Sequence, residues 1–258
     1  MKNKFFYIFL IFSVLIFTNL SGEELQINAT KIQYDDNNKI TIFTGSVDAT
    51  DSKNNKLLTN YAEYNRIEKT LETKGLTEII TSQGYSVKGT NIIFDNKKKV
   101  ISSDNKTQVL DKDGNKISLE MFNYFIEKSI FFSKGKVEVL DINQNKYSFS
   151  QIYIDEIKKK MVGSDVKAFL NSKDIIINES NEPRFFANTV SVSNDQSIFN
   201  KGVFTYCKNR EKNKCPPWQI QSKKIQHNLA KKTIYYDNAV LKVYDFPIFF
   251  FPKFSHPD

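Results

Sequence analysis

The sequence contains few of the residues that catalysis and metal binding use. Its 258 residues include only two cysteines, two histidines and one tryptophan. It has no G-x-S-x-G elbow, no H-E-x-x-H pair and no glycine-rich phosphate loop. A closed zinc site needs four ligands, and Cys207, Cys215, His227 and His256 do not have the spacing of one. We therefore predict no catalytic site, no metal site and no cofactor, and we do not expect an enzyme.

Long apolar runs are also lacking, apart from one at the N-terminus. Lys2 and Lys4 precede an apolar stretch of about 13 residues, 5–17, which a short segment of mostly small residues follows. A membrane-spanning helix needs about 20 apolar residues, so this stretch is too short to be a typical anchor. The pattern predicts that residues 1–22 are a secretory signal peptide and that the chain is exported.

The charge balance is basic but does not suggest nucleic-acid binding. Lysine and arginine outnumber aspartate and glutamate by 37 to 29, and loss of the predicted signal peptide lowers the net charge from +8 to +6. The basic residues form no single stripe, and an exported protein rarely meets nucleic acid. Lysines 97–99 and 158–160 fall in predicted turns, where they favour solubility and keep strand edges unpaired.

A repeat of about thirty residues runs through the first two thirds of the chain. An apolar or aromatic position recurs at intervals of 30, 30, 31 and 29 residues, and a polar turn follows each time, at Tyr34, Tyr64, Phe94, Phe125 and Ile154. Further turn signals leave segments of about six to nine residues rich in Ile, Val, Phe, Tyr and Thr, which is strand length and strand composition. No long segment has helical periodicity.

A column of glycines suggests how these strands are arranged. Gly45, Gly75, Gly135, Gly163 and Gly202 recur at one place in the repeat, and Asn238 takes the same place near the end. Glycine in a strand marks a bulge or a bend. Repeated bends would stack into an edge, so we predict an all-β fold: a stacked antiparallel β-jellyroll, that is, a folded-over two-sheet solenoid.

The last part of the chain departs from the repeat. The loop "CKNREKNKCPPW" interrupts it, and the chain then ends on "DFPIFFFPKFSHPD", its most aromatic stretch. We divide the chain into a jellyroll at 23–206, a cysteine-bearing insertion at 207–217, and last strands plus a connector at 218–258. In an exported protein, Cys207 and Cys215 are better candidates for a disulfide than for a metal.

With these features the sequence resembles the OstA-like β-jellyroll family of lipopolysaccharide (LPS) transport proteins. The thirty-residue units are shared with LptA and LptC, whereas residues 216–258 resemble the jellyroll-to-barrel junction of the outer-membrane LPS-assembly protein LptD. The resemblance implies transport of LPS across the periplasm and its assembly into the cell outer membrane, with this segment on the periplasmic side. The junction residues would be Trp218, Pro247, Pro252 and Pro257, leading to a barrel that this sequence does not contain.

The resemblance also implies an apolar groove that holds the acyl chains of lipid A while the sugar headgroup stays in water. The turn lysines would then attract the lipid A phosphates. We expect these residues to face the groove: Ile40, Ile42, Val47, Ile92, Phe94, Phe125, Phe131, Val137, Val139, Ile152 and Ile154. The residues alone are equally compatible with an ordinary sandwich core.

The implied partners are LPS, an LptA-like periplasmic bridge that pairs with an edge strand, and an LptE-like outer-membrane lipoprotein reached through the absent barrel. Cys207 and Cys215 would pair with each other or with barrel cysteines. Two alternatives remain: a free-standing LptA-like periplasmic LPS bridge, and a structural β-solenoid that binds no lipid.

Overall fold

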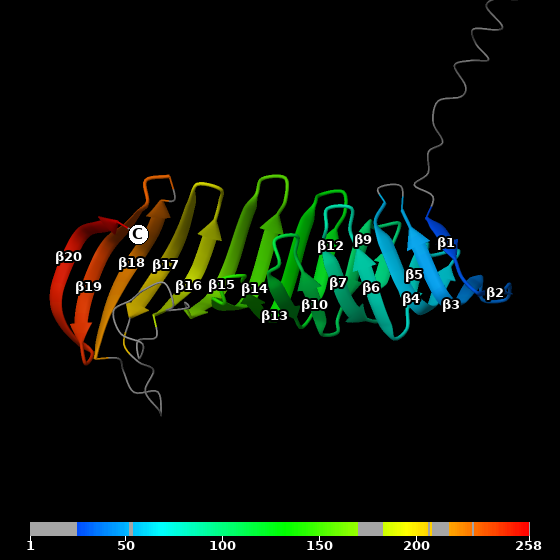
Figure 1. Ribbon diagram of the computed structural model, residues 1–258, viewed down its shortest axis with the longest axis horizontal. Coiled ribbons are helices and arrows are strands. Elements are labelled where there is room, and N and C mark those ends of the chain that lie inside the picture. The colour runs from blue at the N-terminus through cyan, green and yellow to red at the C-terminus, as the bar shows by residue number, and fades with distance from the viewer. Residues whose placement is uncertain are drawn as a thin grey trace, which may run out of the picture.

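The computed structural model describes residues 25–51, 54–169, 183–205, 207, 217–228 and 230–257, and these residues form one antiparallel β-sheet without helices. The predicted signal peptide and Cys215 lie outside the described residues. The strands cross the long axis of the molecule and stack along it, from β1 and β2 at one end to β20 at the other (Figure 1). The prediction of an all-β antiparallel fold is confirmed.

The sheet contains twenty strands: β1 Gln26–Asn28, β2 Lys31–Asp35, β3 Ile40–Thr50, β4 Lys56–Asn65, β5 Thr70–Thr73, β6 Leu76–Ile80, β7 Ser86–Thr90, β8 Ile93–Asp95, β9 Val100–Ser103, β10 Thr107–Leu110, β11 Lys116–Leu119, β12 Phe122–Phe125, β13 Ile130–Leu140, β14 Lys146–Asp155, β15 Lys160–Phe169, β16 Arg184–Val192, β17 Gln196–Thr205, β18 Trp218–Asn228, β19 Thr233–Val243 and β20 Phe246–Pro257. Strands β17 and β18 pair with each other, so the sheet continues across the predicted insertion.

Each time the chain crosses the sheet it bends once, and the row of bends divides the sheet into two layers. We call layer one the part that contains β1, β6, β7, β10 and β11, and layer two the part that contains β2, β5, β8, β9 and β12. The long strands pass through both layers; β3 and β13 bend at register shifts, between Thr44 and Val47 and between Lys134 and Val137. Residues from both layers pack into common clusters, so the layers face each other.

Three glycines of the column and Asn238 lie at the bends, as the sequence predicted. Gly45, Gly75 and Gly135 have φ of +76°, +87° and +93°, and Asn238 has φ of +52° at the bend of β19. L-residues with a Cβ seldom adopt these angles, and Asn is among the exceptions. The fold therefore uses glycine or asparagine where the strand turns from one layer into the other.

Gly163 and Gly202 lie beside the bends, and there glycine is needed because no space is left for a side chain. A Cβ added to Gly163 would lie 2.7 Å from Phe149 Cδ1, and one added to Gly202 would lie 2.7 Å from Ile225 Cδ1. Both glycines are buried. A side chain at either position would collide with the packed interior.

The turns at the far end of layer two follow a strict thirty-residue rule. Residues 36–39, 66–69, 96–99, 126–129 and 156–159 form four-residue turns, and the last residue of each has positive φ. Asp or Asn precedes four of the five turns, at positions 35, 65, 95 and 155, and its side chain accepts backbone N–H groups of the turn. The lysines at 97–99 and 158–159 lie in these turns, as predicted, whereas Lys160, also predicted in a turn, is the first residue of β15.

The turns at the far end of layer one are held by a second pattern. Asp111 Oδ1 accepts the backbone N–H of Asn115 at 2.8 Å, and Asp111 Oδ2 accepts the Asn115 amide at 2.7 Å. The pairs Asp51 with Asn55 and Asp141 with Asn145 repeat this geometry. These short polar side chains bond to their own turn, which explains why they end the strands.

Candidate functional site

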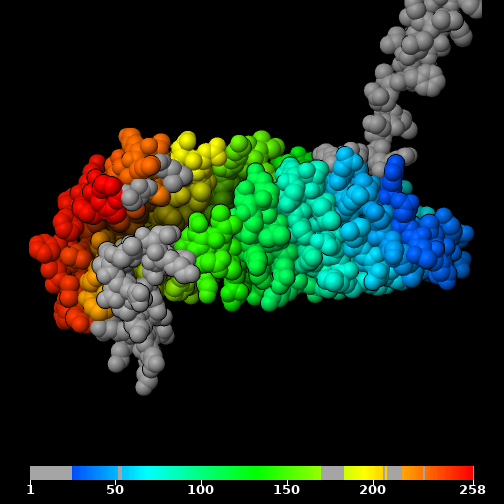
Figure 2. All heavy atoms as spheres, in the orientation of Figure 1, coloured from blue at the N-terminus to red at the C-terminus, as the bar shows by residue number. Residues whose placement is uncertain are grey.

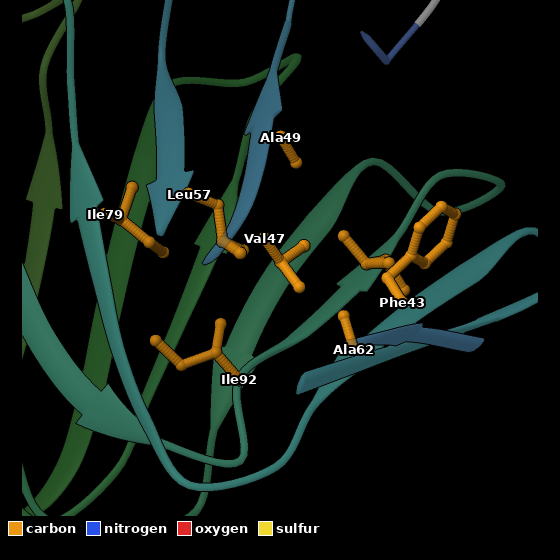
Figure 3. Close-up of a cluster of buried hydrophobic side chains, with 8 residues drawn as sticks. Phe43, Val47, Ala49, Leu57, Ala62, Ile79 and Ile92 are labelled. Carbon is orange, nitrogen blue, oxygen red and sulfur yellow. The ribbon is translucent and has the colours of Figure 1, made fainter. Parts of the chain in front are cut away.

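Two rows of side chains run along the interior from one end of the stack to the other. Successive strands pair residue against residue, so inward-facing side chains of neighbouring strands stand beside one another. The clusters that they form contain residues of both layers; Ile79 of β6 in layer one and Ala62, where β4 pairs with β5 in layer two, belong to the same cluster (Figure 3). The clusters are therefore apolar, although buried Thr and Ser side chains, among them Thr73, Thr77 and Thr107, also lie in the interior.

The row in layer one, which we call ladder one, is apolar or aromatic at every position. Its members pair in this order: Ile27, Ala49, Leu57, Ile79, Val87, Val109, Ile117, Val139, Tyr147, Ala168, Phe185, Phe204, Ile220, Leu241 and Phe249.

The row in layer two, ladder two, is apolar along most of its length and becomes more polar near the C-terminus. Its members pair in this order: Tyr34, Thr41, Tyr64, Leu71, Phe94, Ile101, Tyr124, Phe131, Ile154, Met161, Val192, Ser197, His227, Ile234 and His256.

Tyrosines of both ladders mark where the apolar interior meets water. The hydroxyl of Tyr124 donates to Glu156 Oε2 at 2.9 Å, and the hydroxyl of Tyr147 donates to Asp141 Oδ2 at 3.2 Å. Burial, together with the neighbouring carboxylate, raises the pKa of each tyrosine to about 12. The rings lie in the interior and the hydroxyls reach acidic turns, an arrangement suited to the boundary between an apolar chain and a polar headgroup.

The C-terminal end of the interior is exposed and aromatic. Phe249 pairs with Leu241 of ladder one, and Phe251 and Phe254 continue the same inner face of β20. These three side chains are 58%, 38% and 39% exposed because, within the described part of the chain, β20 pairs with β19 alone. They also stack on one another, with ring centroids of Phe251 and Phe254 5.7 Å apart. The end of the stack at β20 is visible in Figure 2.

Eight of the eleven predicted groove residues face the interior. Val47, Ile92, Val137 and Ile152 are buried in the clusters, and four others pack against them: Phe94, Phe131, Val139 and Ile154. Ladders one and two contain the second four. The structure thus brings these eight residues together along one apolar surface.

The other three predicted groove residues, Ile40, Ile42 and Phe125, lie on the outer face, so their assignment to the groove is corrected. Ile40 and Ile42 alternate along β3 with Thr41 and Phe43, whose buried side chains point inward. Phe125 alternates with Tyr124, which is the residue in ladder two. Since the side-chain period of a strand is two, an offset of one residue moves a side chain to the other face.

For Phe125, the unequal intervals of the repeat were the signal that its assignment to the inner face was wrong. The spacing from Phe94 to Phe125 is 31 and that from Phe125 to Ile154 is 29, whereas Tyr124 restores 30 on both sides. Phe125 instead takes the place that Asp95 and Asp155 have before their turns. The Asp–Asn pairs of the layer-one turns also recur at multiples of thirty residues. They were not among the residues that the sequence had singled out.

The junction residues occupy the last strands of the sheet. Trp218 opens β18; its carbonyl accepts the Thr205 hydroxyl at 2.7 Å, and its ring lies 6.4 Å from that of Phe204. Pro247, Pro252 and Pro257 all fall in β20. Among the described residues β20 pairs with β19 on one side, and proline is tolerated in a strand whose other edge is open.

Cys207 follows β17 in a half-buried position. Its backbone carbonyl accepts a hydrogen bond from the buried Arg184 guanidinium, and its N–H donates to Thr205 Oγ1 at 3.2 Å. Its pairing with Cys215 stays a prediction, because Cys215 lies outside the described residues.

The part of the chain that the structure describes contains no cluster of His, Cys, Asp or Glu able to hold a metal ion. Across the same residues, no helix has the length and hydropathy needed to cross a membrane.

No protein-family model and no curated protein matches the sequence. Solved structures that are similar to this chain include that of LptH, the LptA homologous periplasmic component of the conserved lipopolysaccharide transport device from Pseudomonas aeruginosa. The similarity covers 52% of this chain and 76% of that one, at 15% identity and a TM-score of 0.24. A likeness this weak decides nothing about function. The site is defined by the strand pairings of this chain.

Proposed function

We propose that this chain carries LPS through the periplasm toward the outer membrane, with the acyl chains of lipid A in the interior between the two layers. The observation that carries the proposal is the pair of ladders, which line one apolar path from β1 and β2 to the exposed aromatic face of β20. Burial of a methylene group is worth about 0.8 kcal/mol, so a chain of a dozen carbons would gain on the order of 10 kcal/mol in such a path.

The path has no strong polar interruption at which a lipid would be trapped. Ladder one has no charged residue. Ladder two carries the hydroxyl groups of Thr41 and of three tyrosines before Ser197, and gains imidazole groups only at His227 and His256. Equivalent apolar positions recur at every strand, so a bound chain would move between sites of similar affinity. This regularity suits a conduit, in which a ligand has to leave each site as readily as it enters.

The two ends of the sheet suit the partners that the resemblance implies. The backbone edges of β1 and β2 at one end and of β20 at the other have no partner strand among the described residues. Exposed edges pair readily with strands of another protein. We assign the β1 and β2 end to an LptA-like bridge, and the β20 end to the barrel and LptE-like lipoprotein side of an LptD-like assembly, with this segment in the periplasm.

The experiment that tests the proposal uses neighbouring residues that face opposite sides. A photoreactive amino acid at Phe131, Val139 or Ile154 is expected to crosslink to LPS in cells. The same group at Phe132 or Tyr153, one residue along the strand from Phe131 or Ile154, gives the matched outward-facing control.

LPS crosslinks at the inward positions and not at their neighbours would support the proposal. Crosslinks to protein alone at all three inward positions would overturn it and favour the lipid-free structural solenoid.

The pairing of β20 with β19 along its length also suits a free-standing LptA-like bridge. In that case LPS should crosslink inside, whereas crosslinkers along β20 should capture a periplasmic partner and no outer-membrane protein.

A further inference from the structure

A hollow lies against layer one, and most of the side chains around it point outward, although Val109, Ile117, Val139 and Tyr147 of ladder one also contribute to its lining. It has a volume of about 860 Å³ and lies across strands β7, β10, β11, β13 and β14 and the end of β15. Its size falls in the range of about 300–1,000 Å³ typical of small-ligand sites. Most of its lining side chains alternate along their strands with members of ladder one, and so they point away from the interior.

One row of the lining alternates apolar and cationic side chains. Leu110 pairs with Lys116, Lys116 with Leu140, Leu140 with Lys146, and Lys146 with Phe169. Leu110 and Phe169 are 45% and 39% exposed, which is high for large apolar side chains. The two lysines are two strands apart, a separation of about 10 Å across a sheet.

The charge of the hollow is net positive. Glu138 lies 2.8 Å from Lys136 and Glu78 lies 3.4 Å from Lys88, so the nearby carboxylates are already matched by cations. Neither Lys116 nor Lys146 has an ion pair within the described residues. A ligand with an anionic group would therefore find two uncompensated ammonium groups beside apolar side chains.

We infer that this hollow binds an anionic phospholipid, with its phosphate at Lys116 and Lys146 and its acyl chains on Leu110, Leu140 and Phe169. The strands under the hollow are paired on both sides, so they offer no free backbone donors or acceptors to an added peptide strand. Recognition must come from side chains, and those present are cationic and apolar. This combination matches a phospholipid, which joins a phosphate to hydrocarbon.

The test uses a short-chain phosphatidylglycerol that carries a photoreactive acyl group, below its critical micelle concentration, with the purified full chain. We expect labelling near Leu140 and Phe169, and binding about fivefold weaker in the variant Lys116→Gln/Lys146→Gln, since an exposed ion pair contributes less than about 1 kcal/mol. Binding should also weaken at high salt. Lys31→Gln/Lys223→Gln removes two exposed lysines elsewhere and should bind as the unmodified protein does.

Equal binding of the matching phosphatidylcholine would overturn the inference, because the lysines would then play no part. Labelling confined to inward residues that do not line the hollow, such as Phe131 and Ile154, would also overturn it, while leaving the interior path of the proposed function intact. Labelling of neither face would contradict both the inferred outer site and the proposed interior path. A photoreactive residue at position 140 that crosslinks to a second copy of the chain would identify the hollow as a protein interface and overturn the inference.

Discussion

Asn115 Oδ1 accepts the backbone N–H of Ile142 at 3.1 Å, which links the turn of one repeat to the turn of the next. Asn55 makes the same link to Ser82 at 2.9 Å. The two asparagines lie 60 residues apart, which is two periods of the repeat. The thirty-residue period therefore specifies contacts between repeats as well as the strands within each one.

Replacement of Asn115 by alanine should destabilise the protein by about 1–2 kcal/mol, because it removes the bond to Ile142 and the bond to Asp111. Urea unfolding followed by circular dichroism would measure the change. Gln83→Ala, in an exposed turn of the same layer, is the control and should change stability by less than about 0.5 kcal/mol. Equal effects of the two variants would contradict a linking role for Asn115.

The bend at Gly75 should accept asparagine better than valine. A Cβ at this position meets no atom within 4 Å, so the backbone angle of +87° is the only obstacle. Asn tolerates positive φ, as Asn238 does at the bend of β19. Gly75→Asn should therefore cost well under 1 kcal/mol and Gly75→Val about 1–2 kcal/mol in thermal or urea unfolding.

Gly202 should behave in the opposite way, since space and not backbone angle limits it. A Cβ there would lie 2.7 Å from Ile225 Cδ1 and 3.0 Å from Phe185 Cζ. Gly202→Ala and Gly202→Asn should both destabilise the fold, by about 1–3 kcal/mol. If Gly202→Asn were tolerated as well as Gly75→Asn, the distinction between the two kinds of glycine would fail.

Tyr124 and Phe125 should differ in importance although they are neighbours. Tyr124 belongs to ladder two and packs against the central cluster, whereas Phe125 lies on the outer face. Tyr124→Ala should cost about 2–4 kcal/mol and Phe125→Ala about 1 kcal/mol or less. Similar losses of unfolding free energy at both positions would show that the register of β12 is misassigned.

Stability should fall at alkaline pH because of the two interior tyrosines. Burial raises the pKa of Tyr124 and of Tyr147 to about 12, whereas an unfolded tyrosine titrates near 10. Between these values the unfolded chain releases protons that the folded chain keeps, so stability is complete below about pH 10 and is lost as pH rises toward 12. The urea midpoint should decline less steeply across this window in Tyr124→Phe and Tyr147→Phe. Parallel curves would contradict the assignment.

The sequence by itself determined the class of the fold. Turn residues at a thirty-residue period cut the chain into strand-length segments, and glycine at a recurrent position forced a bend, since positive φ excludes most other residues. Gly45, Gly75 and Gly135 could be placed at the bends because glycine reports a backbone requirement directly. Eight groove candidates could be assigned to the interior because apolar alternation follows burial.

Only the tertiary structure decided which face each residue occupies and which residues meet. A strand has a period of two, so an error of one position at Phe125, Ile40 or Ile42 reverses the face while leaving the composition of the strand unchanged. The two ladders and the outer hollow arise from pairing between residues tens of positions apart, and no local pattern fixes that register. The sequence specified where the chain turns, and the strand pairing specified what lies inside.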